Sequence, residues 1–338
     1  MGTVRTVLVT GGAGYIGSHA VLALRDAGRP VVVLDDLSTG RRAAVPDGVP
    51  FVAGDAGDPA LVGRLLRDHA VGAVMHFAGS IVVPDSVERP LDYYRNNTLT
   101  SHALIVACVQ AGVERFIFSS TAAVYGMPDR LPIDEDTALR PINPYGSSKL
   151  MTEWMLRDAA AAHGLRPVVL RYFNVAGADP ALRSGQSTRV ATHLLKIAAQ
   201  VATGQRPELQ VFGDDYPTPD GTCVRDYIHV SDLAAAHVAA LEHLERGGGA
   251  LTLNCGYGRG YSVRAMVEAV ERALGRPLAV RMAGRRAGDP PALVADVGRI
   301  GRTLDWTPRF ADLDGIVATA LAWERRLVEQ PAGAVAAD

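Results

Sequence analysis

Short apolar runs alternate with amphipathic stretches through the first half of the chain. The apolar runs cover residues 4–10, 31–34, 50–53, 73–76, 116–119 and 167–171; helical patterns extend from the first run to residue 27 and recur near 58–68, 98–111 and 145–163. Strands that alternate with helices of about 10–15 residues are typical of βαβ units and a mostly parallel sheet. We therefore predict that residues 1–175 form a doubly wound, Rossmann-type α/β domain.

The pattern becomes less regular beyond residue 175. Loops rich in Asp, Gly and Pro fill much of 178–221 around one helix near 189–203, and a strand at 226–229 precedes a helix at 233–244. We expect 226–248 to return to the first domain, while 176–225 and 249–330 form a smaller mixed α/β domain that binds the substrate. The tail at 331–338 is rich in small residues, and we expect it to be frayed.

Composition narrows the classes of partner. The 338 residues are 48% hydrophobic and 21% charged, with a formal net charge of -2, so we expect neither nucleic acid nor a membrane as a partner. No apolar run has the length of a membrane-spanning helix. Three widely spaced cysteines (Cys108, Cys223 and Cys255) and nine histidines show no metal-ligand spacing, so we expect no metal and reduced thiols in a cytoplasmic protein.

The basic residues are strongly biased towards arginine. Of the 34 basic residues, only Lys149 and Lys196 are lysines, and the other 32 are arginines. Because the chain has arginine at almost every basic position, the lysine at position 149 indicates that this position needs a lysine.

Three glycines follow the first strand and open the first helix. Gly11, Gly14 and Gly17 would allow a tight turn and a close approach of the backbone to a pyrophosphate, which the helix N-terminus favours. Asp35 ends the next strand, where an acid would bind the ribose hydroxyls of an adenosine. Because its carboxylate would repel a 2′-phosphate, we expect the cofactor to be NAD rather than NADP.

Tyr145 and Lys149 are candidates for the chemistry. They are four residues apart in a predicted helix, so their side chains share one face. A neighbouring ammonium and a bound nicotinamide cation would lower the pKa of the phenol from about 10. The phenolate could then take the proton of a hydroxyl whose carbon loses a hydride. Thr121, after the strand at 116–119, is placed to bind the same hydroxyl.

The glycine spacing together with the later Tyr145–Lys149 motif resembles the short-chain dehydrogenase/reductase superfamily. This resemblance implies that Asp55 and Ala56 lie beside the adenine, and that the segment after the strand at 73–76 lies near the pyrophosphate and the nicotinamide ribose. The full set of cofactor residues that it implies is Gly11, Gly14, Tyr15, Ile16, Gly17, Asp35, Asp55, Ala56, Phe77, Ala78, Gly79, Asn97, Tyr145, Lys149 and Phe173.

Longer stretches are similar to the UDP-galactose (UDP-glucose) 4-epimerase family. They are GGAGYIGSH at 11–19, NPYGSSK at 143–149, RYFNVAGA at 171–178 and VFGDDYPTPDGTCVRDYIHV at 211–230, and the likeness runs from about residue 4 to 325. It implies a UDP-hexose substrate, a homodimer formed through the helices near 98–111 and 145–163, and Tyr145 as the base that takes the O4 proton. The substrate residues that it implies are Thr121, Tyr145, Tyr172, Asn174, His193, Leu194, Phe212, Arg225, Arg286, Asp289 and Leu293.

Within this resemblance, Asn174, Arg225 and Arg286 would hold the UDP phosphates. Asp289 would take the uridine ribose, Phe212 would lie against the uracil, and His193 would be at most a contact residue beside the sugar. These roles suit the residue types, since guanidinium groups match phosphate oxygens and aromatic faces stack on bases.

Other features separate the competing functions. Nucleotide-sugar dehydratases of the superfamily carry an Asp-Glu pair directly after the threonine, whereas this chain has Ala122 and Ala123, which disfavours dehydration. Ile81 replaces a lysine near the cofactor, and Leu293 replaces a bulky tyrosine, which predicts some activity on UDP-N-acetylhexosamines. An epimerase of UDP-pentose or UDP-uronate remains an alternative, and a non-enzymatic NAD-sensing protein is disfavoured because Tyr145 and Lys149 are both present.

Overall fold

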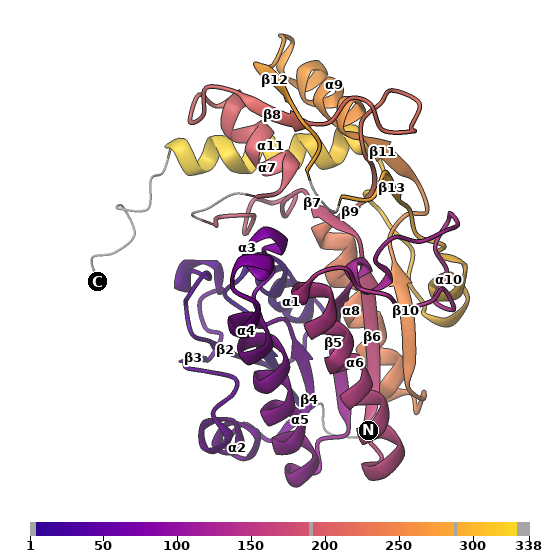
Figure 1. Ribbon diagram of the computed structural model, residues 1–338. Coiled ribbons are helices and arrows are strands. Elements are labelled where there is room, and N and C mark those ends of the chain that lie inside the picture. Colours follow the sequence, from indigo (N-terminus) through magenta and orange to yellow (C-terminus); the bar gives the residue numbers. More distant parts are fainter. Residues whose placement is uncertain (1–4, 189–191, 287–288, 330–338) are drawn as a thin grey trace.

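A parallel sheet of seven strands forms the larger half of the molecule (Figure 1) in the computed structural model, which describes residues 5–188, 192–286 and 289–329. The strand order is β10-β6-β5-β4-β1-β2-β3, so the order reverses between β1 and β4. The carboxyl ends of strands at such a reversal open a crevice for ligands. The bounds are β1 Thr6–Thr10, β2 Val31–Asp35, β3 Phe51–Ala53, β4 Val71–His76, β5 Arg115–Thr121, β6 Arg166–Tyr172 and β10 Leu251–Cys255.

Helices cover both faces of this sheet, because its central strands are apolar on both sides. Val9 of β1 is aligned with Val33 of β2 and with Met75 of β4, and all three side chains are buried. Residues of α1 (Tyr15–Asp26) and α8 (Val230–Glu245) share one core with these strands. Residues of α2 (Pro59–Asp68), α5 (Thr100–Ala111) and α6 (Pro144–His163) belong to the core on the other face. This arrangement confirms the predicted doubly wound α/β fold.

Short helices connect β4 to α5. They are α3 (Val83–Glu88), α4 (Pro90–Tyr93) and a π-helical turn at Tyr94–Leu99, which leads directly into α5. The helix predicted near 98–111 is therefore the last part of a longer helical run. Two 3₁₀ turns, Arg42–Ala44 and Ala122–Tyr125, follow β2 and β5.

The smaller half contains two short sheets and three packed helices. Strand β9 (Val224–His229) is the centre of the first sheet, with β7 (Asn174–Ala176), β11 (Gly260–Ser262) and β13 (Ala292–Leu293) as its partners. Strands β8 (Leu209–Phe212) and β12 (Val280–Ala283) form a parallel pair. A third core combines residues of α7 (Leu194–Ala202), α9 (Val263–Leu274) and α11 (Leu313–Glu329), and α10 (Gly298–Thr303) lies against β10.

Two segments lie in a different half of the molecule from the one that the sequence pattern predicts. Strand β10, which the pattern places in the smaller domain, pairs with the outer edge of β6 in the large sheet. The strand at 226–229, which we expect in the first domain, belongs to β9 in the smaller half, and it is α8 that returns to pack against α1. The first residues of the helix predicted near 189–203 and the tail at 331–338 lie outside the described residues.

Hydrogen bonds join α1 to the segment that leads into the smaller half. The Tyr15 hydroxyl donates to the Gly177 carbonyl at 2.6 Å, and the Ser18 and Ser184 hydroxyls lie 2.7 Å apart. The Asp179 amide donates to His19 Nε2 at 3.1 Å. The helix that starts at the glycine loop is thus fixed to both halves. Among the described residues, no helix is both long and apolar enough to cross a membrane.

Candidate active site

The glycine loop brings the backbone of β1 close to the end of β4. Gly11 has φ +70°, and a Cβ at this position would come within 2.5 Å of the Ala78 amide nitrogen. A Cβ at Gly17 would meet the Gly11 carbonyl oxygen at 2.1 Å, so neither position admits a side chain. Within the described part of the chain, no side chain caps α1 at Gly14. The first turn of α1 therefore presents backbone N–H groups to an anion.

Asp35 lies at the carboxyl end of β2, beside this loop. Its carboxylate is almost fully buried and accepts hydrogen bonds from the amides of Ala13 at 2.9 Å and Leu37 at 2.8 Å. Burial raises its pKa above the usual range, while these two amides act in the opposite direction. The acid is thus held at the position where the sequence predicts a ribose contact.

Asp55 and Ala56 come after the carboxyl end of β3, at the same edge of the sheet as Asp35. Asp55 accepts a hydrogen bond from the Gly57 amide at 2.7 Å, and Ala56 is buried in the core that covers α2 and α5. Their side chains are thus occupied by the turn and the core, and an adenine contact stays a prediction.

Asn97 fixes the turn that follows β4. Its Oδ1 accepts from the Ser80 amide at 2.7 Å, and its Nδ2 donates to the Ser80 carbonyl and to Ser148 Oγ on α6. A Cβ at Gly79 would lie 2.9 Å from this amide and 3.6 Å from Lys149 Nζ. The predicted cofactor residues Gly79 and Asn97 and the predicted catalytic Lys149 therefore meet in one corner.

Tyr145 lies in the first turn of α6, which begins at Pro144 after an Asn143 cap. Its phenol is buried and hydrogen bonds with the side chain of Thr121, and the centres of the Tyr145 and Tyr93 rings lie 6.5 Å apart in a T-shaped arrangement. Burial raises the pKa of this phenol, and the hydrogen bond with Thr121 offsets part of the rise. The lowered pKa that the sequence predicts is therefore not a property of the protein alone, since desolvation disfavours the phenolate.

Lys149 shares the face of α6 that carries Tyr145, as the spacing predicts. Its ammonium donates to the Ser119 carbonyl at 3.1 Å and lies 5.0 Å from the centre of the Phe118 ring. Residues 5–188, 192–286 and 289–329 contain no carboxylate within ion-pair distance of it. Burial lowers its pKa to about 8. The charge is thus held beside the site without neutralisation.

Four of the predicted substrate residues gather in the smaller half. Arg225 on β9 lies 3.8 Å from the Asp289 carboxylate, and the Arg286 guanidinium covers the Phe212 ring at 4.3 Å. Arg286 is exposed, whereas the other three are half-buried. The Asp289 amide also donates to the Arg286 carbonyl at 3.4 Å, so these four residues form one cluster with an aromatic face and two guanidinium groups. Asn174, the other predicted phosphate residue, is not part of this cluster.

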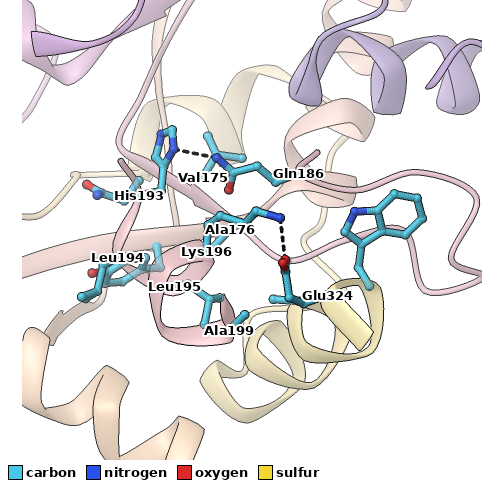
Figure 2. A pocket seen from close by; sticks show the side chains of 14 residues that line it. Val175, Ala176, Gln186, His193, Leu194, Leu195, Lys196, Ala199 and Glu324 are labelled. Carbon is cyan, nitrogen blue, oxygen red and sulfur yellow. Dashed lines mark hydrogen bonds and ion pairs between the residues drawn. The ribbon is translucent and has the colours of Figure 1, made fainter. Parts of the chain in front are cut away.

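Asn174, His193 and Leu194 line a single pocket at the start of α7 (Figure 2). His193 Nδ1 is 2.8 Å from Gln186 Nε2, and burial lowers the pKa of this imidazole. Deeper in the pocket, Lys196 Nζ lies 2.5 Å from the Glu324 carboxylate on α11. Asn174, His193 and Leu194 thus lie together, and their roles in substrate binding stay a prediction.

Tyr172 is aligned with Thr121 of β5, and Leu293 is aligned with Arg225 of β9. The Tyr172 hydroxyl hydrogen bonds with Ser119 Oγ, at the end of β5. Phe173 and Leu293 pack against the same small core as Ala122. The end of β6 therefore connects the catalytic corner with the cluster in the smaller half.

Comparison with known proteins identifies the family. The profile of the NAD dependent epimerase/dehydratase family matches residues 7–256, which is more than half of the chain. The chain belongs to the NAD dependent epimerase/dehydratase family. A UDP-glucose 4-epimerase of Azospirillum brasilense is 64% identical over 327 residues, which cover 97% of this chain and 94% of that protein.

Solved structures agree with this family. The UDP-glucose 4-epimerase from Brucella ovis in complex with NAD has a TM-score of 0.91 and 49% identity, covering 94% of this chain and 98% of that one. The Bifidobacterium longum UDP-glucose 4-epimerase in complex with NAD+ and UDP has a TM-score of 0.90 and 38% identity, covering 95% of this chain and 98% of that one.

The residues of the larger half fit the cofactor of an NAD dependent epimerase/dehydratase. An uncapped helix N-terminus and a glycine loop without room for side chains suit a pyrophosphate, and a buried carboxylate at the end of β2 suits ribose hydroxyls. Asp35 also leaves no favourable place for a second phosphate. The family and the side chains therefore agree on NAD.

Two buried ion pairs of this family member escaped the sequence analysis. Glu153 pairs with Arg171 and also hydrogen bonds with Ser120, next to Thr121, and Lys196 pairs with Glu324 in the pocket that Asn174 lines. Each pair joins residues far apart in the chain, which leaves no local pattern. Weak signals existed: Glu153 lies one helical turn beyond Lys149, and Lys196 is the only other lysine.

Proposed function

We propose that this chain is a UDP-glucose 4-epimerase that interconverts UDP-galactose and UDP-glucose with bound NAD. The observation that carries the proposal is the buried contact between Thr121 and Tyr145, beside the unneutralised Lys149, at the sheet end that also holds the glycine loop. The family and the 64% identical relative support it. Ala122 and Ala123, in place of an acidic pair, favour epimerisation over dehydration.

The cofactor residues divide by the part of NAD that they would hold. The first turn of α1 would bind the pyrophosphate, Asp35 the adenosine ribose, and the Gly79 corner with Lys149 the nicotinamide ribose. When bound, NAD⁺ supplies a hydride acceptor in the first half of the cycle and a hydride donor in the second.

Tyr145 is proposed to move the proton. Its phenolate oxygen would take the proton of the O4 hydroxyl, which Thr121 orients, while C4 loses its hydride and becomes a ketone. The same phenol would return the proton to O4 when the hydride comes back to the other face of the sugar. Because burial raises the pKa of Tyr145 in the protein alone, the phenolate needs the charge of Lys149 and of the bound cofactor.

The smaller half is proposed to hold the UDP group throughout the cycle. Asn174, Arg225 and Arg286 would bind the two phosphates, Phe212 the uracil and Asp289 the uridine ribose. Strong binding of the nucleotide and weak binding of the sugar would allow the 4-keto sugar to rotate and present its opposite face before reduction. Inversion at C4 requires that rotation.

The central test is the Tyr145→Phe variant with UDP-galactose. Production of UDP-glucose, followed by chromatography, should fall by about 10²–10⁴-fold because the proton carrier is lost, while NAD recovered from the denatured variant should match the wild type. Tyr94→Phe, at a half-buried tyrosine in the π-helical turn, is the matched control. Full activity of Tyr145→Phe, or wild-type protein that leaves UDP-galactose unchanged, would refute the proposal.

We infer a wider substrate range from Leu293. This side chain is half-buried and leaves more room than a tyrosine beside the proposed sugar site. UDP-GalNAc and UDP-galactose should therefore both react, and Leu293→Tyr should abolish the first reaction while keeping the second. Equal amounts of enzyme, incubated separately with UDP-galactose, UDP-GalNAc and UDP-arabinose, make this comparison; no reaction with UDP-GalNAc contradicts the inference.

We also infer that two copies associate through α5 and α6. Leu99 and Val106 are seven residues apart and exposed on one helical face, and Trp154 of α6 is 46% exposed. Exposed apolar groups on neighbouring helices are typical of an interface between copies. Light scattering should give a dimer mass for the wild type and a monomer for Trp154→Glu. The three free, buried cysteines support a reducing, cytoplasmic location.

A further inference from the structure

A buried acid follows the two catalytic side chains along α6. Tyr145, Lys149 and Glu153 are spaced four residues apart, so they share one face of the helix. The Glu153 carboxylate points to the strand end rather than to Lys149, and it is only 6% exposed. A buried carboxylate needs partners for both oxygens. Those partners identify what it does.

Glu153 connects α6 to β5 and β6 at once. Its Oε1 accepts a hydrogen bond from Ser120 Oγ at 2.5 Å, and Ser120 is fully buried. Arg171 on β6 donates to the same carboxylate through Nε at 3.1 Å and through Nη2 at 2.5 Å. The acid is thereby saturated with donors from both strands.

The Arg171 guanidinium extends the same connection beyond Thr121. Its Nη1 donates to the Tyr125 hydroxyl at 3.0 Å, and that hydroxyl donates to Asn254 Oδ1 at 2.7 Å. Tyr125 closes the 3₁₀ turn that follows Thr121. Within this turn, Thr121 Oγ1 accepts from the Ala123 amide at 3.1 Å.

Thr121 is therefore held from both directions along the chain. Ser120 precedes it and is tied to Glu153, and Tyr125 follows it and is tied to Arg171. We propose that Glu153 and Arg171 are positioning residues that fix Thr121 against the phenol of Tyr145, acting through Ser120 and Tyr125. This inference rests on the proposed function, because it assigns a purpose to the contact between Thr121 and Tyr145.

The positioning role predicts an effect on turnover rather than on binding. The network touches neither the glycine loop nor the cluster of Arg225, Asp289, Phe212 and Arg286, so NAD retention and the KM for UDP-galactose should stay close to the wild type. A misplacement of about 1 Å at a reacting group lowers the rate by about 100-fold. Loss of the tie to Ser120 should accordingly lower kcat by roughly 10–100-fold.

Ser120→Ala removes this tie and leaves the ion pair in place. The matched control is Thr152→Val, on the neighbouring residue of α6, where the hydroxyl is also fully buried but donates to the Ser148 carbonyl of its own helix at 3.2 Å. We expect a reduced kcat for Ser120→Ala alone, with unchanged KM and NAD content. Wild-type kcat in Ser120→Ala, or an equal loss in Thr152→Val, would overturn the proposal.

A second background separates positioning from general weakening of the core. In Glu153→Met/Arg171→Met, Ser120 has already lost its partner, so adding Ser120→Ala should lower kcat no further. If Ser120→Ala lowers kcat as much in this background as in the wild type, the proposal is contradicted. If the double variant does not fold, the kcat of the Ser120→Ala single variant decides. Wild-type activity on UDP-galactose, with its loss in Tyr145→Phe, tests the proposed function separately.

Discussion

Lys149 and Lys196 are both buried, but they lie in different halves of the molecule and have different neighbours. Lys149, in the larger half, donates to a backbone carbonyl and lies near a phenylalanine ring. Lys196, in the smaller half, pairs with Glu324 on α11, and Glu324 also accepts from Gln205 at 2.7 Å. The first ammonium keeps its charge free of a carboxylate, and the second has its charge cancelled.

This difference shows what each half requires of a lysine. An unpaired buried charge costs folding free energy, and burial accordingly lowers the pKa of Lys149 to about 8. The charge remains available to a phenol one helical turn away. At Lys196 the ion pair joins α7 to α11 in the pocket that Asn174 also lines. In the larger half a buried charge stays unpaired beside the proposed catalytic phenol at a cost in folding free energy, whereas in the smaller half the charge forms an ion pair that joins two helices.

The largest effect is expected at Lys149. Lys149→Met should lower kcat by about 10²–10³-fold, since the phenolate loses its cation, yet the variant should be more stable than the wild type. The pKa shift from 10.5 to about 8 corresponds to about 2–4 kcal/mol. Activity assays and thermal unfolding at equal NAD saturation measure both quantities. A less stable variant would show that Lys149 has a structural role instead.

Breaking the ion pair between Lys196 and Glu324 should lower the free energy of unfolding, which is the opposite of the effect on stability expected for Lys149→Met. Glu324→Gln leaves the Lys196 ammonium buried without a counter-charge, which should cost about 3–5 kcal/mol. Denaturant unfolding measures the loss, and Lys196→Met/Glu324→Met should recover most of it because no charge remains. A double variant as unstable as Glu324→Gln would mean that the pair does more than cancel charge. The KM for UDP-galactose should rise in Glu324→Gln, since His193 lies at the N-cap of α7.

The buried Lys149 should also make the stability of the protein depend on pH. The unfolded chain binds a proton at Lys149 up to about pH 10.5 and the folded chain up to about pH 8, so the wild type gains stability as pH rises between these values. The stability advantage of Lys149→Met is therefore full below pH 8 and disappears towards pH 10.5. Unfolding curves of both proteins across this range measure it. A pH-independent difference would refute the assignment.

The smallest effect tests why these two positions kept lysine. Lys196→Arg places a larger, planar group in a well-filled site and should cost about 1–3 kcal/mol. The reverse exchange at the surface, Arg272→Lys in an exposed pair with Asp314, should stay within about 0.5 kcal/mol. Denaturant unfolding measures both losses. Equal losses of unfolding free energy in Lys196→Arg and Arg272→Lys would show that the preference for lysine at position 196 is not steric.

Local patterns carried most of what the sequence could predict. The apolar runs correctly gave the strands around the glycine loop, and a spacing of four residues correctly placed Tyr145 and Lys149 on one helical face. These features depend on residues that are neighbours in the chain. The resemblance to 4-epimerases extended the prediction to the smaller half, where Arg225, Asp289, Phe212 and Arg286 lie together and their contacts with UDP stay a prediction.

Long-range partners were beyond such patterns. Strand β10 pairs with β6 after a long excursion through the smaller half, and nothing in its own residues distinguishes it from the other short strands there. Glu324 pairs with a lysine 128 residues away, so neither residue reveals the other. The lowered pKa of Tyr145 was predicted from Lys149 together with a bound nicotinamide cation, whereas burial, which depends on the whole fold, raises this pKa in the protein alone.

The late arrival of β10 has a consequence for biosynthesis. When the first 175 residues leave the ribosome, the outer edge of β6 has no neighbouring strand, and α8 has not yet been made to cover α1. The face of α1 can be covered only after residue 245 emerges, and the edge of β6 can be paired only after residue 255 emerges. An uncovered strand edge and an apolar face are sites for aggregation. The nascent chain is therefore expected to depend on chaperones during translation of the region between β6 and β10.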